Sequence, residues 1–320
     1  MTILSSLIPI FGIIFVGAVI QRARLLHGNT AQCLNQFVYW ISLPAMLFTQ
    51  MAGCDSRSFS GEIIAGTFAG LAASFIAAYI AARAGMRRGG KESIVLGLLG
   101  SFPNYGYMGL SVIILLLPGD EFALATAIVI TVIGNATFIF VDVLLELLRE
   151  GKGRTGAVRG VFAASAKNPV LLSALCGILI SVSGIPFPKT CMAALSMLAA
   201  TAAPCALFSI GMSLHMQLAS ASGGYLARLA NHLPVHLAKF VAQPLLTYVC
   251  LAAFGVSGMA LNVGVLVSAM PAGVSCILLS EKYNVAVEDT PVIIFMSTAF
   301  SLFTISLTAL ALHAVNGFGA

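Results

Sequence analysis

The stretch Ser101–Gly109, S-F-P-N-Y-G-Y-M-G, lies inside one long apolar segment, and Ser268–Cys276, S-A-M-P-A-G-V-S-C, lies inside another. Proline removes a backbone donor and clashes with the preceding helical turn, so the two segments are predicted to unwind at Pro103 and Pro271. The polar backbone groups freed by such a break are tolerated in a membrane only where protein or a cavity surrounds them. Two broken helices at matching positions of two halves indicate the binding site of a transporter.

The composition favours the membrane interior. Of the 320 residues, 59% are hydrophobic and 8% are charged, with a mean hydropathy of +1.01. The net charge of +5 does not predict a nucleic-acid partner, because Lys and Arg lie in short clusters between apolar segments and form no basic face. We therefore expect a lipid bilayer around the chain.

Charged and turn-rich joints divide the chain into ten apolar segments. They are residues 3–20, 31–51, 62–83, 93–117, 122–148, 169–185, 190–214, 231–254, 258–280 and 287–314. Segments of roughly 20 residues match a hydrocarbon core about 30 Å thick. The first has no basic n-region and no A-x-A site, so it is expected to be retained and not to be a signal peptide. The predicted fold class is an all-α integral membrane protein with ten transmembrane helices.

The positive residues predict the orientation. With the N-terminus outside, thirteen of the 16 Lys and Arg residues fall in inner loops, Arg57 and Lys189 fall in outer loops, and Lys239 lies within a helix. This bias predicts a multi-pass protein of the cytoplasmic membrane with both termini outside.

The chain also repeats itself weakly. P-A-M-L-F at Pro44–Phe48 returns as P-C-A-L-F at Pro204–Phe208, an offset of 160, and Pro103 and Pro271 are 168 residues apart. The pairs occupy the second and fourth helices of consecutive five-helix halves, and because five is odd the halves enter the membrane in opposite orientations. A five-residue match alone can arise by chance; the agreement of position, proline and segment number favours inverted repeats. The predicted division is 1–150 for the first repeat, 151–168 for a cytoplasmic linker and 169–320 for the second repeat.

Four motifs are spaced along nearly the whole chain. They are I-P-I-F-G-I-I-F-V-G from Ile8, L-N-Q-F-V-Y-W-I-S-L-P-A-M-L-F from Leu34, F-P-N-Y-G-Y-M-G-L from Phe102 and K-F-V-A-Q-P from Lys239. Together they resemble the auxin efflux carrier family of membrane transporters. The compact length and the P-N-Y-G segment are most similar to its bacterial malonate-transporter branch. The short connection after the fifth segment differs from the long insertion of many plant auxin carriers, which argues against an auxin-specific role.

The resemblance implies a scaffold of helices 1, 2, 6 and 7, often dimeric, and a moving transport unit of helices 3–5 and 8–10, in which the broken helices 4 and 9 cross. Half-helix N-termini carry partial positive charge and free amides that can hold a carboxylate, so a small organic anion is the expected substrate of a secondary carrier. A passive channel for small solutes, an auxin-like weak-acid exporter, and a membrane enzyme or receptor are the alternatives. No phosphate loop, H-E-x-x-H or G-x-S-x-G motif supports an enzyme or a nucleotide-driven pump, so we expect no cofactor and energy from a gradient, with protons or sodium as candidate coupling ions.

Asn104 is the leading contact residue, because its amide can donate to a carboxylate or repair the backbone opened by Pro103. The Tyr105 hydroxyl can donate to substrate, or its ring can pack between helices. Gly106 and Gly273 allow the unusual backbone and a close crossing.

Other candidates are polar residues beside the breaks. Ser101, Ser275 and Cys276 border the substrate site or serve helix packing. Asn135 and its apparent counterpart Thr298 either line the cavity or make local hydrogen bonds, as the neighbouring Ser297 can.

Two ionisable residues lie at depth, where charge indicates function by default. At a helical rise of about 1.5 Å per residue, Lys239 is expected about 12 Å and Asp142 about 10 Å from the same cytoplasmic side. Lys239 is therefore expected to attract the anion or to pair with Asp142, and Asp142 to take up a proton; the alternative is that Lys239 snorkels to the interface while Asp142 caps backbone or faces water. His232 and His236 share a helix face, but a zinc site is not favoured without a third ligand.

Overall fold

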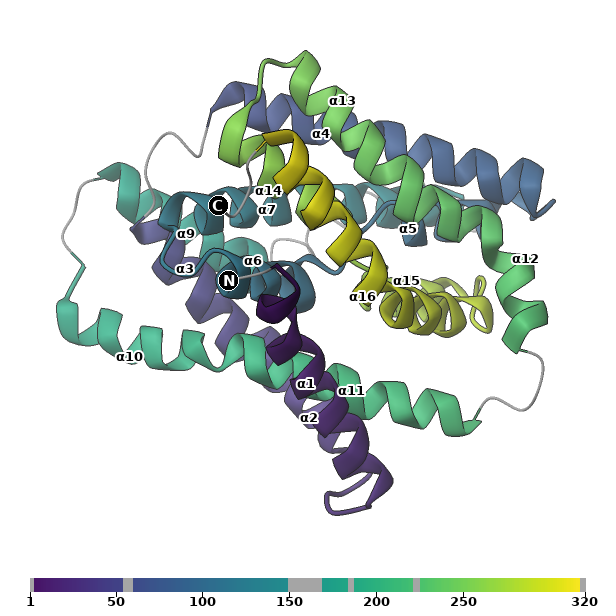
Figure 1. The fold of residues 1–320 in the computed structure, drawn as a ribbon, viewed down its shortest axis with the longest axis horizontal. Helices are drawn as coiled ribbons and strands as arrows, with labels where there is room; N and C mark the ends of the chain where they lie inside the picture. Colours follow the sequence, from purple (N-terminus) through teal and green to yellow (C-terminus); the bar gives the residue numbers. More distant parts are fainter. Residues whose placement is uncertain (1–2, 54–59, 149–168, 184–186, 221–224, 317–320) are drawn as a thin grey trace.

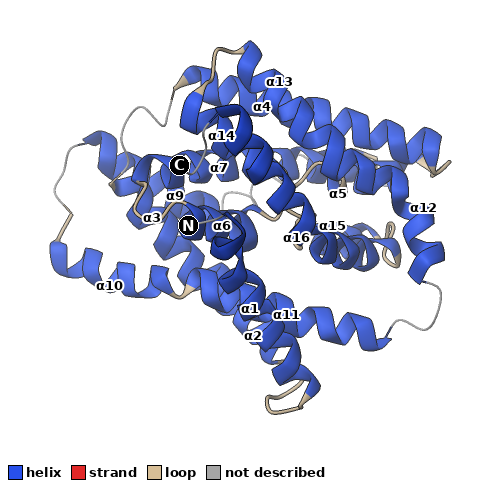
Figure 2. Cartoon of the chain, in the orientation of Figure 1, coloured by secondary structure: helices blue, strands red, loops and turns tan. Residues whose placement is uncertain are grey.

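The computed structural model describes residues 3–53, 60–148, 169–183, 187–220 and 225–316, and helices joined by short loops make up this part of the chain, with one isolated β-bridge (Figures 1 and 2). The α-helices are α1 (Ile3–Arg22), α2 (Thr30–Phe37), α3 (Leu43–Ala52), α4 (Gly61–Ile80), α5 (Gly90–Leu99), α6 (Leu110–Leu116), α7 (Glu121–Leu147), α9 (Pro169–Ser183), α10 (Lys189–Ala200), α11 (Ala202–Ser220), α12 (Tyr225–Leu237), α13 (Gln243–Ala253), α14 (Gly258–Ser268), α15 (Cys276–Tyr283) and α16 (Asp289–Asn316). Wider π-helical turns are η1 (Val38–Ser42), η3 (Ala81–Gly85), η4 (Tyr105–Gly109) and η5 (Ala238–Ala242). Each of the ten predicted segments is therefore helical over most of its described length.

Several of these helices are long and apolar enough to cross a membrane. In the described part of the chain there are four such stretches, Gly61–Gly85, Glu121–Leu147, Lys189–Ser213 and Ala230–Ala253, and a fifth if the halves of α16, bent by 47°, count as one. Shorter apolar helices include Tyr105–Leu116, which follows the predicted break at Pro103, and Gly258–Ser268, which precedes the predicted break at Pro271. The structure is that of a multi-pass membrane protein.

Prolines explain where several helices change course. Pro44 follows η1 at the start of α3, and Pro244 follows η5 at the start of α13. A widened turn accommodates the missing donor and the ring without ending the helix. The predicted seventh helix, in contrast, is interrupted at Thr201, whose hydroxyl lies 2.6 Å from that of Ser42.

The helices form two packed groups. In the first, α1 packs on α11 and α3 packs on α9 and α10. In the second, α4 packs on α13, as Figure 1 shows along its upper edge, and α14 packs on α7 and α13. Residues 93–99 of α5 and residues 260–268 of α14 are all buried, so these two short helices form the core of the second group.

Glycines allow close backbone contact within the first group. A Cβ at Gly17 would lie 2.3 Å from the carbonyl oxygen of Phe208, and one at Gly177 would lie 2.7 Å from the carbonyl oxygen of Phe48. Gly177 lies 160 residues after Gly17, and Phe208 lies 160 residues after Phe48; this is also the offset of the P-A-M-L-F and P-C-A-L-F motifs. The contact of α1 with α11 is thus repeated by the contact of α9 with α3.

Candidate substrate site at two crossed helix breaks

Two extended segments cross where the helices are interrupted. The first joins α5 to η4, and the second joins α14 to α15. The backbone N–H of Asn104 donates to the carbonyl of Pro271 over 2.8 Å, and that of Gly273 donates to the carbonyl of Phe102 over 2.8 Å. This reciprocal exchange forms an antiparallel bridge and joins the two breaks directly.

The bridge is centred on Pro103 and Ala272. Its two donors are the N–H groups of Asn104 and Gly273, which flank this pair, so the exchange needs no N–H from Pro103 or Pro271. Both helices are interrupted where the prolines predicted a break.

Side chains from neighbouring helices satisfy backbone groups that the breaks release. Gln243 donates its Nε2 to the carbonyl of Ser101 over 2.7 Å. The Ser297 hydroxyl accepts from the backbone N–H of Ala272 over 3.0 Å. Lys239 donates its Nζ to the carbonyl of Ser268 over 3.0 Å and to Oε1 of Gln243. Irregular backbone at this depth therefore has the protein partners it requires.

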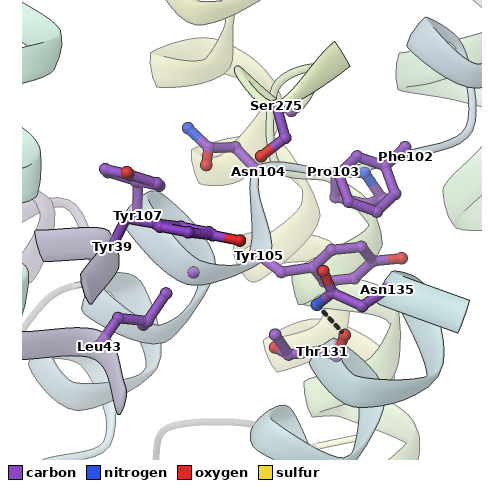
Figure 3. Close-up of a pocket in the computed structure, with 12 residues that line it drawn as sticks. Tyr39, Leu43, Phe102, Pro103, Asn104, Tyr105, Tyr107, Thr131, Asn135 and Ser275 are labelled. Atoms are coloured by element: carbon purple, nitrogen blue, oxygen red, sulfur yellow. Dashed lines mark hydrogen bonds between the residues drawn. The ribbon is translucent and has the colours of Figure 1, made fainter. Parts of the chain in front are cut away.

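A cavity of about 40 Å³ lies against the crossing (Figure 3). Its lining consists of Tyr39, Leu43, Phe102, Pro103, Asn104, Tyr105, Gly106, Tyr107, Thr131, Asn135, Gly273 and Ser275. Most of these residues come from the two crossing segments, from η4 and from α7, whereas Tyr39 lies in η1 and Leu43 begins α3, which packs in the first group. The volume has room for roughly three water molecules at about 10–15 Å³ each.

Asn104 and Tyr105 have polar atoms without partners among the described residues. Asn104 is 4% exposed and its Nδ2 has no hydrogen-bond acceptor; Tyr105 is 3% exposed and its hydroxyl has none. The Tyr105 ring packs so closely on Gly134 that a Cβ there would lie 2.4 Å from it. The Tyr105 ring thus packs between helices, while the Tyr105 hydroxyl and the Asn104 amide both retain unused donor capacity, which is costly in a buried position without a ligand.

Asn135 and Thr298 line different cavities. Asn135 lines the first cavity and donates its Nδ2 to the Thr131 carbonyl, as drawn in Figure 3. Thr298 lines a second cavity of about 40 Å³ with Asn35 and Ser213, and its hydroxyl donates to the carbonyl of Ile294. Both residues therefore lie beside the crossing, with hydroxyl or amide donors bonded within their own helices.

The remaining predicted neighbours have mainly structural contacts. Ser101 donates its hydroxyl back to the carbonyl of Gly97, and Cys276 is fully buried at the start of α15. Gly106 and Gly273 lie where side chains would meet Leu43 and Phe102. Only Ser275 of the small polar group lines the first cavity.

The predicted ion pair between Lys239 and Asp142 does not form in the structure. Asp142 accepts from Lys282 at 2.7 Å and from the Tyr283 hydroxyl at 2.6 Å, both at the end of α15, whereas Lys239 in η5 donates to Ser268 and Gln243. Lys239 is 1% exposed and held by the carbonyl and amide oxygens described above, so it does not snorkel to an interface.

One of the two histidines, His232, has a carboxylate nearby that the sequence pattern did not indicate. His232 Nε2 lies 2.8 Å from Asp289, which also pairs with Arg88 at 3.0 Å. Among the described residues, no group of three or more His, Cys, Asp or Glu side chains is arranged to hold a metal ion.

Gln243 and Ser297 are important residues whose roles were not predicted. Gln243 stands four residues after Lys239 in K-F-V-A-Q-P, a polar pair one helical turn apart in an apolar segment. That pairing was the available signal. Ser297 was predicted only to bond within its own helix. It does donate to the carbonyl of Ile294, and it also accepts from the N–H of Ala272 in the second break.

A multi-pass helical bundle with two crossed helix breaks beside polar cavities has the architecture of a membrane transport protein. The chain belongs to the family described as "Membrane transport protein", whose profile matches residues 2–157 and 157–309, and this confirms the resemblance to the auxin efflux carriers.

Individual relatives extend over most of the chain. It is 25% identical over 310 residues to a "Putative malonate transporter" of Rhizobium meliloti (strain 1021), covering 95% of this chain and 94% of that protein. It is 25% identical over 309 residues to an uncharacterized transporter of Methanocaldococcus jannaschii, covering 92% and 94%. It is 23% identical over 295 residues to the uncharacterized transporter YfdV of Escherichia coli K12, covering 88% of each.

Proposed function

We propose that this protein is a secondary carrier that moves a small organic carboxylate, with malonate as the first candidate, across the cytoplasmic membrane by alternating access. The observation that carries the proposal is the buried Asn104 amide, which has no acceptor among the described residues and lines a cavity at the crossing. A carboxylate oxygen would complete its hydrogen bonding. The relative named as a malonate transporter supports this substrate class.

The half-helices around the crossing supply a suitable potential. The helix that begins at Tyr105 and the helix that begins at Cys276 both start next to it, with Asn104 and Ser275 at their N-cap positions. A helix N-terminus carries about +0.5 elementary charge, so two of them favour an anion without a side-chain cation. The contribution of the helix at Cys276 is this partial charge, because its first N–H groups already donate to backbone carbonyls.

The two helix groups correspond to a fixed scaffold and a moving transport unit. Both cavities are lined by residues of the two groups: Tyr39 and Leu43 face the first, and Asn35 and Ser213 face the second, opposite residues of the crossing and of α16. A cavity of about 40 Å³ is too small for a dicarboxylate at ordinary pocket volumes of about 300 Å³ or more. Movement of one group against the other would enlarge one cavity while keeping the other closed.

We further propose that the ten helices form two inverted five-helix repeats with both termini outside. The repeated glycine contacts at an offset of 160 residues and the reciprocal bridge between the breaks are the two supports within the structure. A homodimer through the scaffold is consistent with α10, which has no buried residue in the described chain. Coupling to protons or sodium stays a proposal, and we expect no enzymatic activity.

The test uses purified protein in proteoliposomes with labelled malonate. A carrier gives saturable uptake and counterflow, whereas a channel gives neither trans-stimulation nor turnover-limited flux. Asn104→Ala should weaken substrate binding by roughly 10- to 150-fold, the equivalent of about 1.5–3 kcal/mol for a hydrogen bond to a charged group. Asn135→Ala is the matched control, because its amide already has an acceptor, and it should weaken binding less.

A thermal-shift screen of carboxylates at two pH values, with and without sodium, tests substrate and coupling together. If another carboxylate stabilises the protein and malonate does not, the substrate assignment is wrong while the carrier stands. Unchanged affinity in Asn104→Ala would remove the assigned site.

A further inference from the structure

The ammonium group of Lys239 lies where two half-helices present their carbonyl ends. Nζ donates to the carbonyl of Ser268, the last residue of α14, over 3.0 Å. It also donates to Gln243, whose Nε2 donates over 2.7 Å to the carbonyl of Ser101, just past the end of α5. Lys239 and Gln243 are 1% and 0% exposed, so solvent ions do not screen these contacts.

The C-terminal end of a helix carries about −0.5 elementary charge. The ends of α5 and α14 together amount to about one negative charge in a buried region, and a single compact cation balances them. Unwound carbonyls and half-helix C-termini are also the groups that bind alkali cations in transporters. Here the side chain of Lys239 takes that place.

We propose that Lys239 is a tethered cation that replaces an inorganic monovalent cation at the crossing, so that this position needs no sodium ion during transport. Gln243 links Lys239 to the end of α5: its Oε1 accepts from Lys239 Nζ, and its Nε2 donates to the carbonyl of Ser101. The anion cavity and the cation position are then separate: helix N-termini face the first and helix C-termini hold the second. The transport part of this inference rests on the proposed carrier function; the cation position itself does not.

The experiment removes the tether and supplies free cations. Lys239→Ala leaves a carbonyl-lined space, whereas Lys239→Met fills the space without charge. Thermal unfolding of the detergent-purified full chain is measured in choline, sodium, potassium and ammonium chloride at equal ionic strength. Lys282→Ala is the control, because the Lys282 side chain is 42% exposed and its loss opens no buried cation position.

The wild type and Lys282→Ala should each unfold at one temperature in all four salts. Lys239→Met should be less stable than the wild type in every salt. Lys239→Ala should be destabilised in choline and recover saturably in ammonium, potassium or sodium, and carboxylate uptake in proteoliposomes should return at least tenfold with the same cation.

The inference is overturned if Lys239→Met matches the wild type, or if Lys239→Ala has the same stability in all four salts, including the case in which no salt yields folded protein. Recovery of stability without malonate uptake by any variant or by the wild type would support the cation position and refute the substrate assignment. The two proposals therefore fail separately.

Discussion

Replacing Gly273 with alanine should disrupt the crossing by steric overlap alone. A Cβ at this position would lie 2.5 Å and 2.7 Å from two ring carbons of Phe102, whereas carbon atoms in favourable contact are about 3.5–4.0 Å apart. Gly273 does not have a left-handed backbone, so no conformational strain is added. The overlap is therefore close to 1 Å, by the difference between these distances.

The surroundings leave the ring little room to retreat. Phe102 packs against Tyr105 at 5.2 Å and Phe138 at 5.5 Å between ring centroids. Relief must come from widening the bridge, whose two hydrogen bonds contribute about 0.5–1.5 kcal/mol each. Overpacking of this kind costs about 1–3 kcal/mol. We expect Gly273→Ala to lose that much stability, and substrate affinity to fall because the cavity is built on the same bridge.

Thermal unfolding in detergent, followed by helical circular dichroism, measures the stability loss. Gly109→Ala is the matched control, since its Cβ would be 3.5 Å or more from every neighbour. Removing the ring in Phe102→Ala should make Gly273→Ala far less harmful than in the wild-type background, a coupling of about 0.5–3 kcal/mol. Equal unfolding temperatures for the Gly273 and Gly109 variants, or additive losses in the double variant, would refute the reasoning.

Three further predictions concern contacts outside the cavity, each checked by thermal unfolding in detergent. Gly17→Ala should cost about 1–3 kcal/mol because its Cβ would lie 2.3 Å from a backbone oxygen, whereas Gly12→Ala, with nothing within 4 Å, should be neutral; equal stability of the two would contradict the close contact of α1 with α11. Ser297→Ala should cost about 1–3 kcal/mol, because it leaves the buried N–H of Ala272 in the second break unpaired. Ser301→Ala should cost clearly less, since the Ser301 hydroxyl donates within its own helix; the reverse order would refute the role of Ser297 as the acceptor for this N–H. Lys282→Ala breaks a partly exposed ion pair with α7 and should cost less than about 1 kcal/mol, and a larger loss would mean that this pair is more important to the fold than its exposure suggests.

The sequence predicts the breaks well because their cause is local. Proline cannot complete a helical hydrogen bond, and at Pro103 and Pro271 a glycine follows within three residues, so these two stretches are predicted to be interrupted from their own residues. Pro44 and Pro244 show that proline alone does not suffice, because widened turns accommodate them. The register of the bridge is not local. It depends on which N–H and carbonyl groups face each other when the segments cross, and that places Ala272, not Pro271, opposite Pro103.

The candidate site divides in the same way. Asn104 was predicted from its position beside a break, and the structure places it in the first cavity. Distance along a helix gives depth in the membrane but not the direction in which a side chain points. Asp142 and Lys239 were predicted to lie at similar depths and to be a candidate ion pair, yet Lys282 is the partner of Asp142 in the structure. For the same reason, the sequence could not show that Asn135 and Thr298 line separate cavities.

In the bridge, the N–H groups of Asn104 and Gly273 both donate, so the two breaks place different residues at corresponding donor positions. The difference has a steric reason. Any side chain at Gly273 would begin 2.5 Å from the ring of Phe102, whereas Asn104 has space for its amide at the edge of the cavity. The first break therefore presents the Asn104 amide to the cavity, the second presents Ser275, and Gly273 allows the close approach of the two segments. Two breaks with the same backbone exchange thus give the cavity an asymmetric polar lining.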